Sequence, residues 1–327
     1  MTMNRRTIAK LLAASALGLN GRHATAQTGE MARVVLGFPA GSSIDALARR
    51  VAEKLAPGYA KTTIVENRVG GGGQVAVASL KGTAADGSAI LLTPMSILGV
   101  YPHTYKRLPY DPFADLTPVS NGVTFDYGFA VGPAVPAAIK TVPEFMDWCK
   151  ANPDKASIGS PATGSTLHFT DIVLGRASGV DVTHVGYRGS QAAIQDIIGG
   201  QLPALIGPLG EFLRHLPAGR VRLLASSGAR RSRFTPDVAT LAEQGYKDMV
   251  FSEWFGFFLP GRAAADVVSR LNEALRSALS GGDVASGLAA FALEPTPSSP
   301  AALAQLLRTD FERWGPIVKT IGFTAEN

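Results

Sequence analysis

The sequence contains a single cysteine, Cys149, among 327 residues. One thiol can form neither an intramolecular disulfide nor a cysteine-based metal site. Cys149 ends the helical pattern of residues 145–149, so we interpret it as a small buried apolar side chain rather than a nucleophile. Beyond residue 26 the sequence also lacks any run of about 18 apolar residues, the length needed to span a bilayer. We therefore expect a soluble protein without disulfides.

Excess positive charge is confined to the start of the chain. The first 26 residues hold four cations and no acid, around an apolar stretch at 8–19 that is too short to span a bilayer. Small residues at 24–26 fit a signal-peptidase site, so we predict a signal peptide at 1–26 and a periplasmic mature protein from Gln27. Residues 4–10 approach the twin-arginine pattern, which leaves export by the Sec or the Tat route open.

The remaining chain has little net charge. Without those four cations, 27 Lys and Arg side chains stand against 26 Asp and Glu side chains. No basic stripe interleaved with aromatic residues is present, which disfavours nucleic acid as a partner. The cluster Arg230, Arg231 and Arg233 lies among Gly, Ser and Pro, and we interpret it as a solvated loop.

Catalytic and cofactor motifs are also missing. No histidine pair has HExxH or HxH spacing, and no Gly-x-Ser-x-Gly is present. The glycines at 70–73 are followed by no Gly-Lys-Ser/Thr, so we interpret them as a turn and predict no metal and no cofactor. Ser165 with His168 as its base remains the one hydrolase alternative.

Strand and helix patterns alternate along the chain. Apolar runs at 34–38, 63–66 and 89–93 predict strands, and apolar residues at helical spacing over 44–55 predict a helix. A second series of strands and helices spans 129–225, and residues 252–259 predict a strand that crosses back. Helices at 264–279 and 300–315 should return to the first unit. This alternation indicates an α/β fold, and the turn-rich segment 110–118 is where we expect the chain to leave the first lobe.

Two loops rich in Gly and Ser lead into predicted helices. The first covers Phe38 to Asp45 and the second Ser160 to His168. Helix N-termini present unpaired N–H groups and a partial positive charge, so such loops can hold an anion without a cationic side chain. Ser42 and Asp45 have capping-box spacing. Asp45 either caps the loop or faces an ammonium group of the ligand.

Motifs along nearly the whole chain resemble the periplasmic solute receptors of tripartite tricarboxylate transporters, the Bug family. They include residues 38–45, the run 65–68 with its glycines, 108–112, 159–168, 184–189 and 254–256. The resemblance implies a two-lobed type II periplasmic-binding-protein fold with mixed sheets and a two-strand hinge near Phe125 and Phe251. The expected lobes are 27–125 with 252–327, and 126–251.

The resemblance also implies that the two loops hold the ligand's carboxylate. The residues we expect to bind the ligand are Phe38, Ala40, Gly41, Ser42, Ser43, Asp45, Thr93, Ser160, Thr163, Gly164, Ser165, His168, Tyr187 and Gly207. This sequence has Pro203, Gly207 and Pro208 where the family usually has Asp, Asp and Asn. The loss of acids predicts a carboxylate without an amino group, aromatic or aliphatic dicarboxylic.

The function implied by the resemblance is solute capture for a membrane permease by a monomeric, non-enzymatic receptor. A ligand sensor for a histidine-kinase ectodomain remains an alternative from the same fold. The hydrolase using Ser165 and His168 is the alternative from another class.

Overall fold

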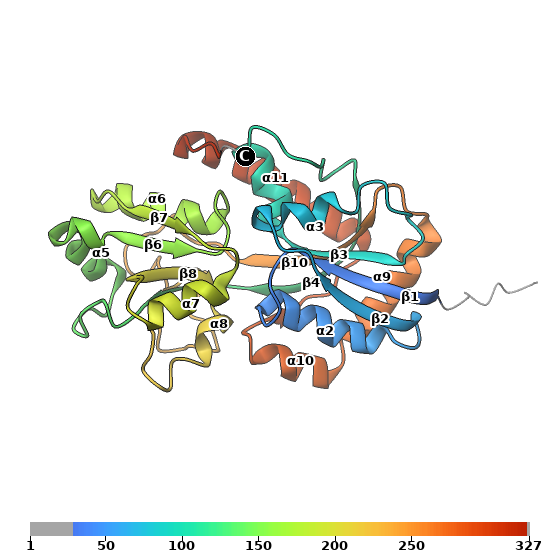
Figure 1. Ribbon diagram of the computed structural model, residues 1–327, viewed down its shortest axis with the longest axis horizontal. Coiled ribbons are helices and arrows are strands. Elements are labelled where there is room, and N and C mark those ends of the chain that lie inside the picture. The colour runs from blue at the N-terminus through green and yellow to red at the C-terminus, as the bar shows by residue number, and fades with distance from the viewer. Residues whose placement is uncertain (1–28, 326–327) are drawn as a thin grey trace, which may run out of the picture.

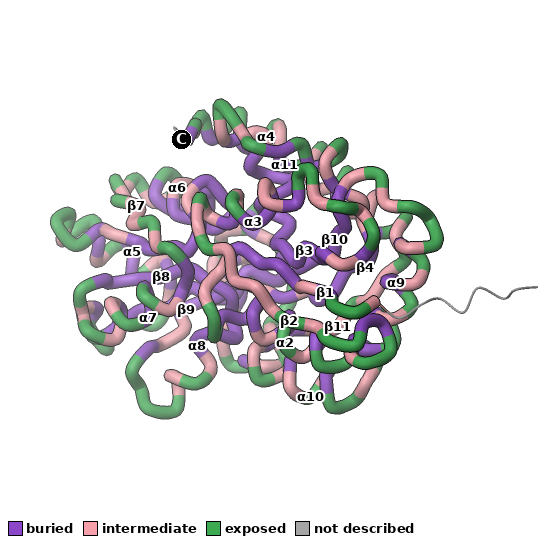
Figure 2. Tube along the Cα trace, turned by 45° about the vertical axis from the view of Figure 1, so that its right-hand side comes forward, coloured by how far each residue is buried: buried purple, intermediate pink, exposed green. Residues whose placement is uncertain are grey.

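The computed structural model describes residues 29–325, and the predicted signal peptide lies outside these residues. Two β-sheets lie side by side, each with helices on both faces (Figure 1). Buried residues concentrate in the strands of both sheets, whereas most loops are exposed (Figure 2). Within 29–325 no helix has the length and apolar character needed to cross a membrane.

The first sheet is mixed. Its strands are β1 (Gly29–Leu36), β2 (Ala60–Asn67), β3 (Ala89–Pro94), β4 (Leu116–Phe125), β10 (Glu253–Pro260) and β11 (Glu294–Pro295). They lie in the order β11-β4-β10-β3-β1-β2. Strand β1 runs parallel to β2 and β3, whereas β10 runs antiparallel to β3 and β4. We call this sheet and its helices the first lobe.

Helices cover both faces of the first sheet because alternate residues of a strand point to opposite sides. Val34 and Leu36 pack in the core that includes α2 (Ser43–Leu55), α9 (Ala265–Leu279) and α10 (Gly282–Ala289). Val35 packs in a second core with α3 (Gln74–Ala78), α4 (Tyr101–Thr104) and α11 (Pro300–Ile321). The apolar face predicted for residues 44–55 is confirmed: Ile44, Leu47, Ala48, Val51, Ala52 and Leu55 are buried.

The second sheet has five strands and defines the second lobe. They are β5 (Tyr127–Val131), β6 (Ser157–Ser160), β7 (Thr183–Gly186), β8 (Ala204–Pro208) and β9 (Arg222–Ser226), in the spatial order β7-β6-β8-β5-β9. Strand β6 is parallel to β7 and β8, and β5 is antiparallel to β8 and β9. Its helices are α5 (Val142–Ala151), α6 (Thr166–Ser178), α7 (Ser190–Ile198) and α8 (Gly210–Leu213).

The chain passes between the lobes twice, from β4 to β5 and from residues 227–252 into β10. Ser227 joins the two passages. Its Oγ accepts a hydrogen bond from the Tyr127 N–H at 2.9 Å and donates one to the Phe251 carbonyl at 2.8 Å. The Phe251 N–H in turn donates to the Ser227 carbonyl.

Two predicted boundaries are wrong. The chain does not leave the first lobe at 110–118, because β4 continues through the sheet to Phe125. Pro118, which suggested a break, lies beside a register shift opposite Phe258, where a missing N–H is tolerated. Helix α11 also extends past Pro316 to Ile321. Burial of Val318 and Ile321 offsets the hydrogen bond that the proline cannot make.

Candidate functional site

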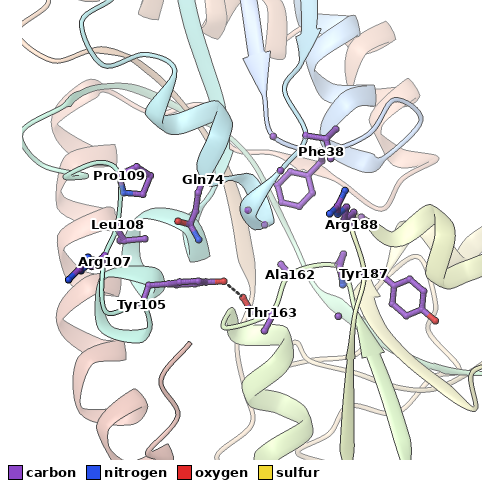
Figure 3. A pocket seen from close by; sticks show the side chains of 18 residues that line it. Phe38, Gln74, Tyr105, Arg107, Leu108, Pro109, Ala162, Thr163, Tyr187 and Arg188 are labelled. Atoms are coloured by element: carbon purple, nitrogen blue, oxygen red, sulfur yellow. Dashed lines mark hydrogen bonds between the residues drawn. The ribbon is translucent and has the colours of Figure 1, made fainter. Parts of the chain in front are cut away.

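Two cavities lie between the lobes. The outer cavity has a volume of about 710 Å³, and residues of both lobes line it, among them Phe38, Gln74, Tyr105, Thr163 and Arg188 (Figure 3). The inner cavity is smaller, about 50 Å³, and shares Phe38, Pro161 and Ala162 with the outer one. These three residues therefore border both cavities.

The first loop turns into α2 beside the inner cavity. Ser42 is the N-cap of α2, but the capping box expected from its spacing to Asp45 is not formed. The Ser42 hydroxyl donates to the Pro39 carbonyl at 2.7 Å, and Asp45 accepts the Gly41 N–H at 2.9 Å. Asp45 thus holds the loop's own backbone.

The charge of Asp45 is balanced within the loop. Burial disfavours ionisation of its carboxyl, but hydrogen bonds from Arg49, the Gly41 N–H and Asn67 outweigh burial and lower its pKa. Arg49 Nε and Asp45 Oδ2 are 2.8 Å apart. Asp45 is 2% exposed and lines neither cavity, so these contacts fit the capping alternative.

Glu211, from α8 of the second lobe, reaches across to the start of α2. Its Oε1 accepts the Ser43 N–H at 2.9 Å and the Ser43 hydroxyl at 2.8 Å. The Glu211 side chain is buried and lines the inner cavity. A carboxylate of the chain itself therefore occupies the first N–H group of this helix.

The second loop begins α6, with Ser165 as its N-cap. The Ser165 hydroxyl accepts the Leu167 N–H at 3.3 Å and donates to the Ala162 carbonyl at 2.6 Å. His168 Nδ1 accepts the Gly164 N–H at 3.2 Å, and burial lowers the pKa of His168 to about 4. Ser165 and His168 are thus committed to the backbone, and the nucleophile and base pair required for the hydrolase alternative is not formed.

A second histidine supports this loop. The rings of His168 and His184 stack with centroids 3.7 Å apart. His184 Nδ1 lies 2.7 Å from Asp171 Oδ2, and its Nε2 lies 3.4 Å from the Thr163 hydroxyl. Burial, and then the neighbouring His168, lower the pKa of His184 to about 3, whereas burial raises the pKa of Asp171 well above its usual range. The cluster is a buried polar support behind the cavity wall.

Glu253, the first residue of β10, forms the centre of a further buried cluster. Its Oε1 accepts the Ser96 N–H at 3.0 Å, and its Oε2 accepts the Ser96 hydroxyl at 2.6 Å and the Tyr127 hydroxyl. Burial raises the pKa of Glu253 to about 7 despite these hydrogen bonds. The side chain is 1% exposed and lines the inner cavity, so Glu253 is the second acid, after Glu211, in the wall of this cavity.

The family described as the tripartite tricarboxylate transporter family receptor matches residues 47–323. The chain belongs to that family. The Bug-type resemblance and the two-lobed fold predicted from the sequence are thereby confirmed.

Known relatives of this receptor cover most of its length. BugT of Bordetella pertussis is 28% identical over 291 residues, which are 89% of each protein. The solved structure of MatC from Rhodopseudomonas palustris with bound malate has a TM-score of 0.82 and 26% identity, covering 88% of this chain and 99% of that one. An R. palustris structure with adipate has a TM-score of 0.85 and 26% identity, covering 91% of this chain and 99% of that one.

The predicted ligand-binding residues fall into three groups in this receptor. Those lining the outer cavity are Phe38, Thr163 and Tyr187, and those lining the inner cavity are Phe38, Ser42, Ser43 and Ser165. Lining neither are Ala40, Gly41, Asp45, Thr93, Ser160, Gly164, His168 and Gly207. The Tyr187 hydroxyl donates to Asp196 at 2.7 Å. Ligand contact by any of these residues stays a prediction.

Sequence reasoning missed Glu211 and Glu253. A signal was present for Glu253, because it is a lone acid among the aromatic residues of 252–259. Acids in apolar segments are rarely buried unless something compensates their charge. Within residues 29–325, no three His, Cys, Asp or Glu side chains are grouped so that they could hold a metal ion.

Proposed function

We propose that this receptor is a periplasmic solute-binding protein that captures a small carboxylate between its lobes and delivers it, chemically unchanged, to the membrane permease of a tripartite tricarboxylate transporter. We further propose that it acts as a monomer. The R. palustris relatives solved with malate and adipate support a carboxylate as the ligand class.

One observation carries the proposal: the starts of α2 and α6, which belong to different lobes, meet at the same inner cavity. Ser42 and Ser43 line it from the first lobe and Ser165 from the second. A solute held there contacts both lobes, and because the Ser43 N–H of α2 is already bonded to Glu211, we assign the carboxylate of the solute to the outer cavity. Arg188 adds a cationic side chain beside Phe38 at the outer cavity (Figure 3).

Capture follows from closure of the lobes about the two passages near Phe125 and Phe251, with lobe boundaries at 125/126 and 251/252. Several hydrogen bonds cross the cleft when it is closed. The Thr104 hydroxyl donates to the Gly164 carbonyl at 3.1 Å, and the Tyr105 hydroxyl donates to the Thr163 carbonyl at 3.0 Å (Figure 3). A ligand with contacts to both lobes shifts the population toward this form.

A thermal-shift screen of the mature protein tests the proposal. The protein is first unfolded and refolded to remove carried-over ligand, and mono-, di- and tricarboxylates are then added. A binder present at 100 times its Kd should stabilise the folded protein by about 2.7 kcal/mol. NMR of the recovered ligand should show it unchanged. A panel without any saturable stabilisation, or with turnover of a carboxylate, contradicts the proposal.

Arg188→Gln and Arg230→Gln provide a matched pair, since both remove one exposed cation and only Arg188 lines the outer cavity. We expect Arg188→Gln to weaken carboxylate binding up to about fivefold, the effect of an exposed charge pair of about 1 kcal/mol. Arg230→Gln should leave binding unchanged. Equal losses in both variants would indicate a general charge effect and no role for Arg188.

A further inference from the structure

Among the described residues, two buried acids and no basic side chain line the inner cavity. Glu211 is 4% exposed and Glu253 is 1% exposed, and both line this space from different lobes. Among residues 29–325, no Lys, Arg or His side chain lines it. Neither carboxylate forms a salt bridge with any described residue. Buried acids are normally paired with a cation, so this cavity lacks a positive partner.

These acids already take the donors that a ligand carboxylate would need. Glu211 accepts both the N–H and the hydroxyl of Ser43, and Glu253 accepts both the N–H and the hydroxyl of Ser96. Ser43 is the first residue of α2, and Ser96 is the first residue of the π-helix η2 (Ser96–Val100). A carboxylate placed in the inner cavity would therefore meet two acids and compete with them for the same N–H groups.

The two acids still have acceptor capacity to offer. A carboxylate can accept about four hydrogen bonds. From residues 29–325, Glu211 Oε2 receives only a long contact, 3.5 Å, from Gln191 Nε2. Within the described part of the chain, Glu253 Oε1 accepts a hydrogen bond from the Ser96 N–H alone. Each acid can thus receive a further N–H from a ligand.

Aromatic rings complete the walls. Phe38, Phe125, Tyr127 and Phe255 line the inner cavity, and the rings of Phe125 and Phe255 have centroids 4.4 Å apart. Aromatic faces attract cations such as ammonium groups, most strongly where water is excluded. Carboxylates and aromatic faces together favour a cation over an anion in this space.

We propose that the inner cavity receives an ammonium group, so that the captured solute is an amino-carboxylate with its amine at Glu211 and Glu253 and its carboxylate toward Arg188. This inference rests on the proposed function, since it assigns the orientation and class of the same ligand. The inner volume of about 50 Å³ suits one small polar group, and the outer volume of about 710 Å³ holds the rest. The proposal replaces the ammonium-free ligand expected from Pro203, Gly207 and Pro208, because Glu211 supplies an acid four residues after Gly207.

Calorimetry with matched ligands tests the inference. The pairs run from succinate with 4-aminobutanoate to adipate with 6-aminohexanoate, so that an ammonium replaces one carboxylate at similar length. In the wild-type receptor we expect the best amino-carboxylate to bind at least about tenfold more tightly than its dicarboxylate partner, a difference of about 1.4 kcal/mol. Glu211→Gln and Glu253→Gln should each reduce this preference, whereas Glu53→Gln, an exposed acid on α2, should keep it.

The outcomes separate the two proposals. Dicarboxylates that bind as tightly as the amino-carboxylates, or more tightly, overturn the inference and leave the proposed function standing. Absence of binding by either class, together with a carboxylate panel that gives no stabilisation, overturns both. The melting temperature of each glutamine variant shows whether it folds. If one does not, the comparison of amino-carboxylates with dicarboxylates in the wild-type receptor still tests the inference.

Discussion

Gly164→Ala should separate closure of the lobes from stability of the fold. Gly164 has φ +78°, and a Cβ there would lie 2.8 Å from Thr104 Cγ2 and 3.2 Å from Tyr105 Cε2, both in the first lobe. The backbone strain, about 1–2 kcal/mol, is present whether the cleft is open or closed and lowers only stability. The steric clash arises on closure, and at about 1–3 kcal/mol it should weaken ligand binding roughly 5- to 150-fold.

Gly179→Ala is the matched control. Gly179 follows the same helix α6 with φ +65°, and a Cβ there meets nothing within 4 Å. Both variants should lose similar unfolding free energy without ligand, but only Gly164→Ala should lose affinity in calorimetry with the best ligand of the screen. Adding Thr104→Ser, which removes the closest methyl and keeps the hydroxyl, should recover part of the loss. Wild-type affinity in Gly164→Ala, or an equal loss in Gly179→Ala, refutes the reasoning.

Four further outcomes are expected. Ser42→Ala should weaken binding less than Gly164→Ala, since the Ser42 hydroxyl donates to a backbone carbonyl and no closure clash arises; calorimetry compares them. With a pKa of about 7, Glu253 is about half protonated at pH 7, so binding of an ammonium ligand should release up to about half a proton. Calorimetry in buffers of different ionisation enthalpy measures this release, which should be absent in Glu253→Gln. Burial lowers the pKa of His168 in the folded protein from 6.5 to about 4. Between these two values the unfolded chain binds one more proton than the folded protein, so the free energy of unfolding falls as the pH falls. His168→Asn should remove up to about 2 kcal/mol of the stability lost between pH 7 and pH 5, measured by denaturant titration. Burial raises the pKa of the Cys149 thiol to about 12, so a thiol reagent should label it only after unfolding, and rapid labelling of the native protein would contradict its placement in the core.

Local patterns predicted the elements that local physics dictates. The helix over 44–55 and the strands around it follow from apolar residues at fixed spacing, and the structure has α2 at Ser43–Leu55. The failures at Pro118 and Pro316 share one cause. A proline ends an isolated element, but surrounding tertiary contacts retained the strand in the first case and the helix in the second.

The two acids that line the inner cavity could not be predicted from local sequence patterns. Glu211 meets Ser43 across 168 positions of the chain, and Glu253 meets Ser96 across 157. No periodicity or motif encodes such a meeting, because Glu211 reaches Ser43 only through the packing of the two lobes, and Glu253 reaches Ser96 only through the pairing of β10 with β3 in the first sheet. Sequence reasoning placed the two loops at a cleft but could not determine which charges the cleft contains.

The hydrogen bonds of Ser227 bear on how the lobes can move. By linking Tyr127 to Phe251, this buried serine ties the two passages together at one point. Two tied passages cannot slide past each other without breaking those bonds, so we expect the low-energy motion to be a rotation about an axis close to Ser227. The length of a bound solute would then determine the angle between the lobes. A docking partner that contacts both lobes could distinguish one angle from another.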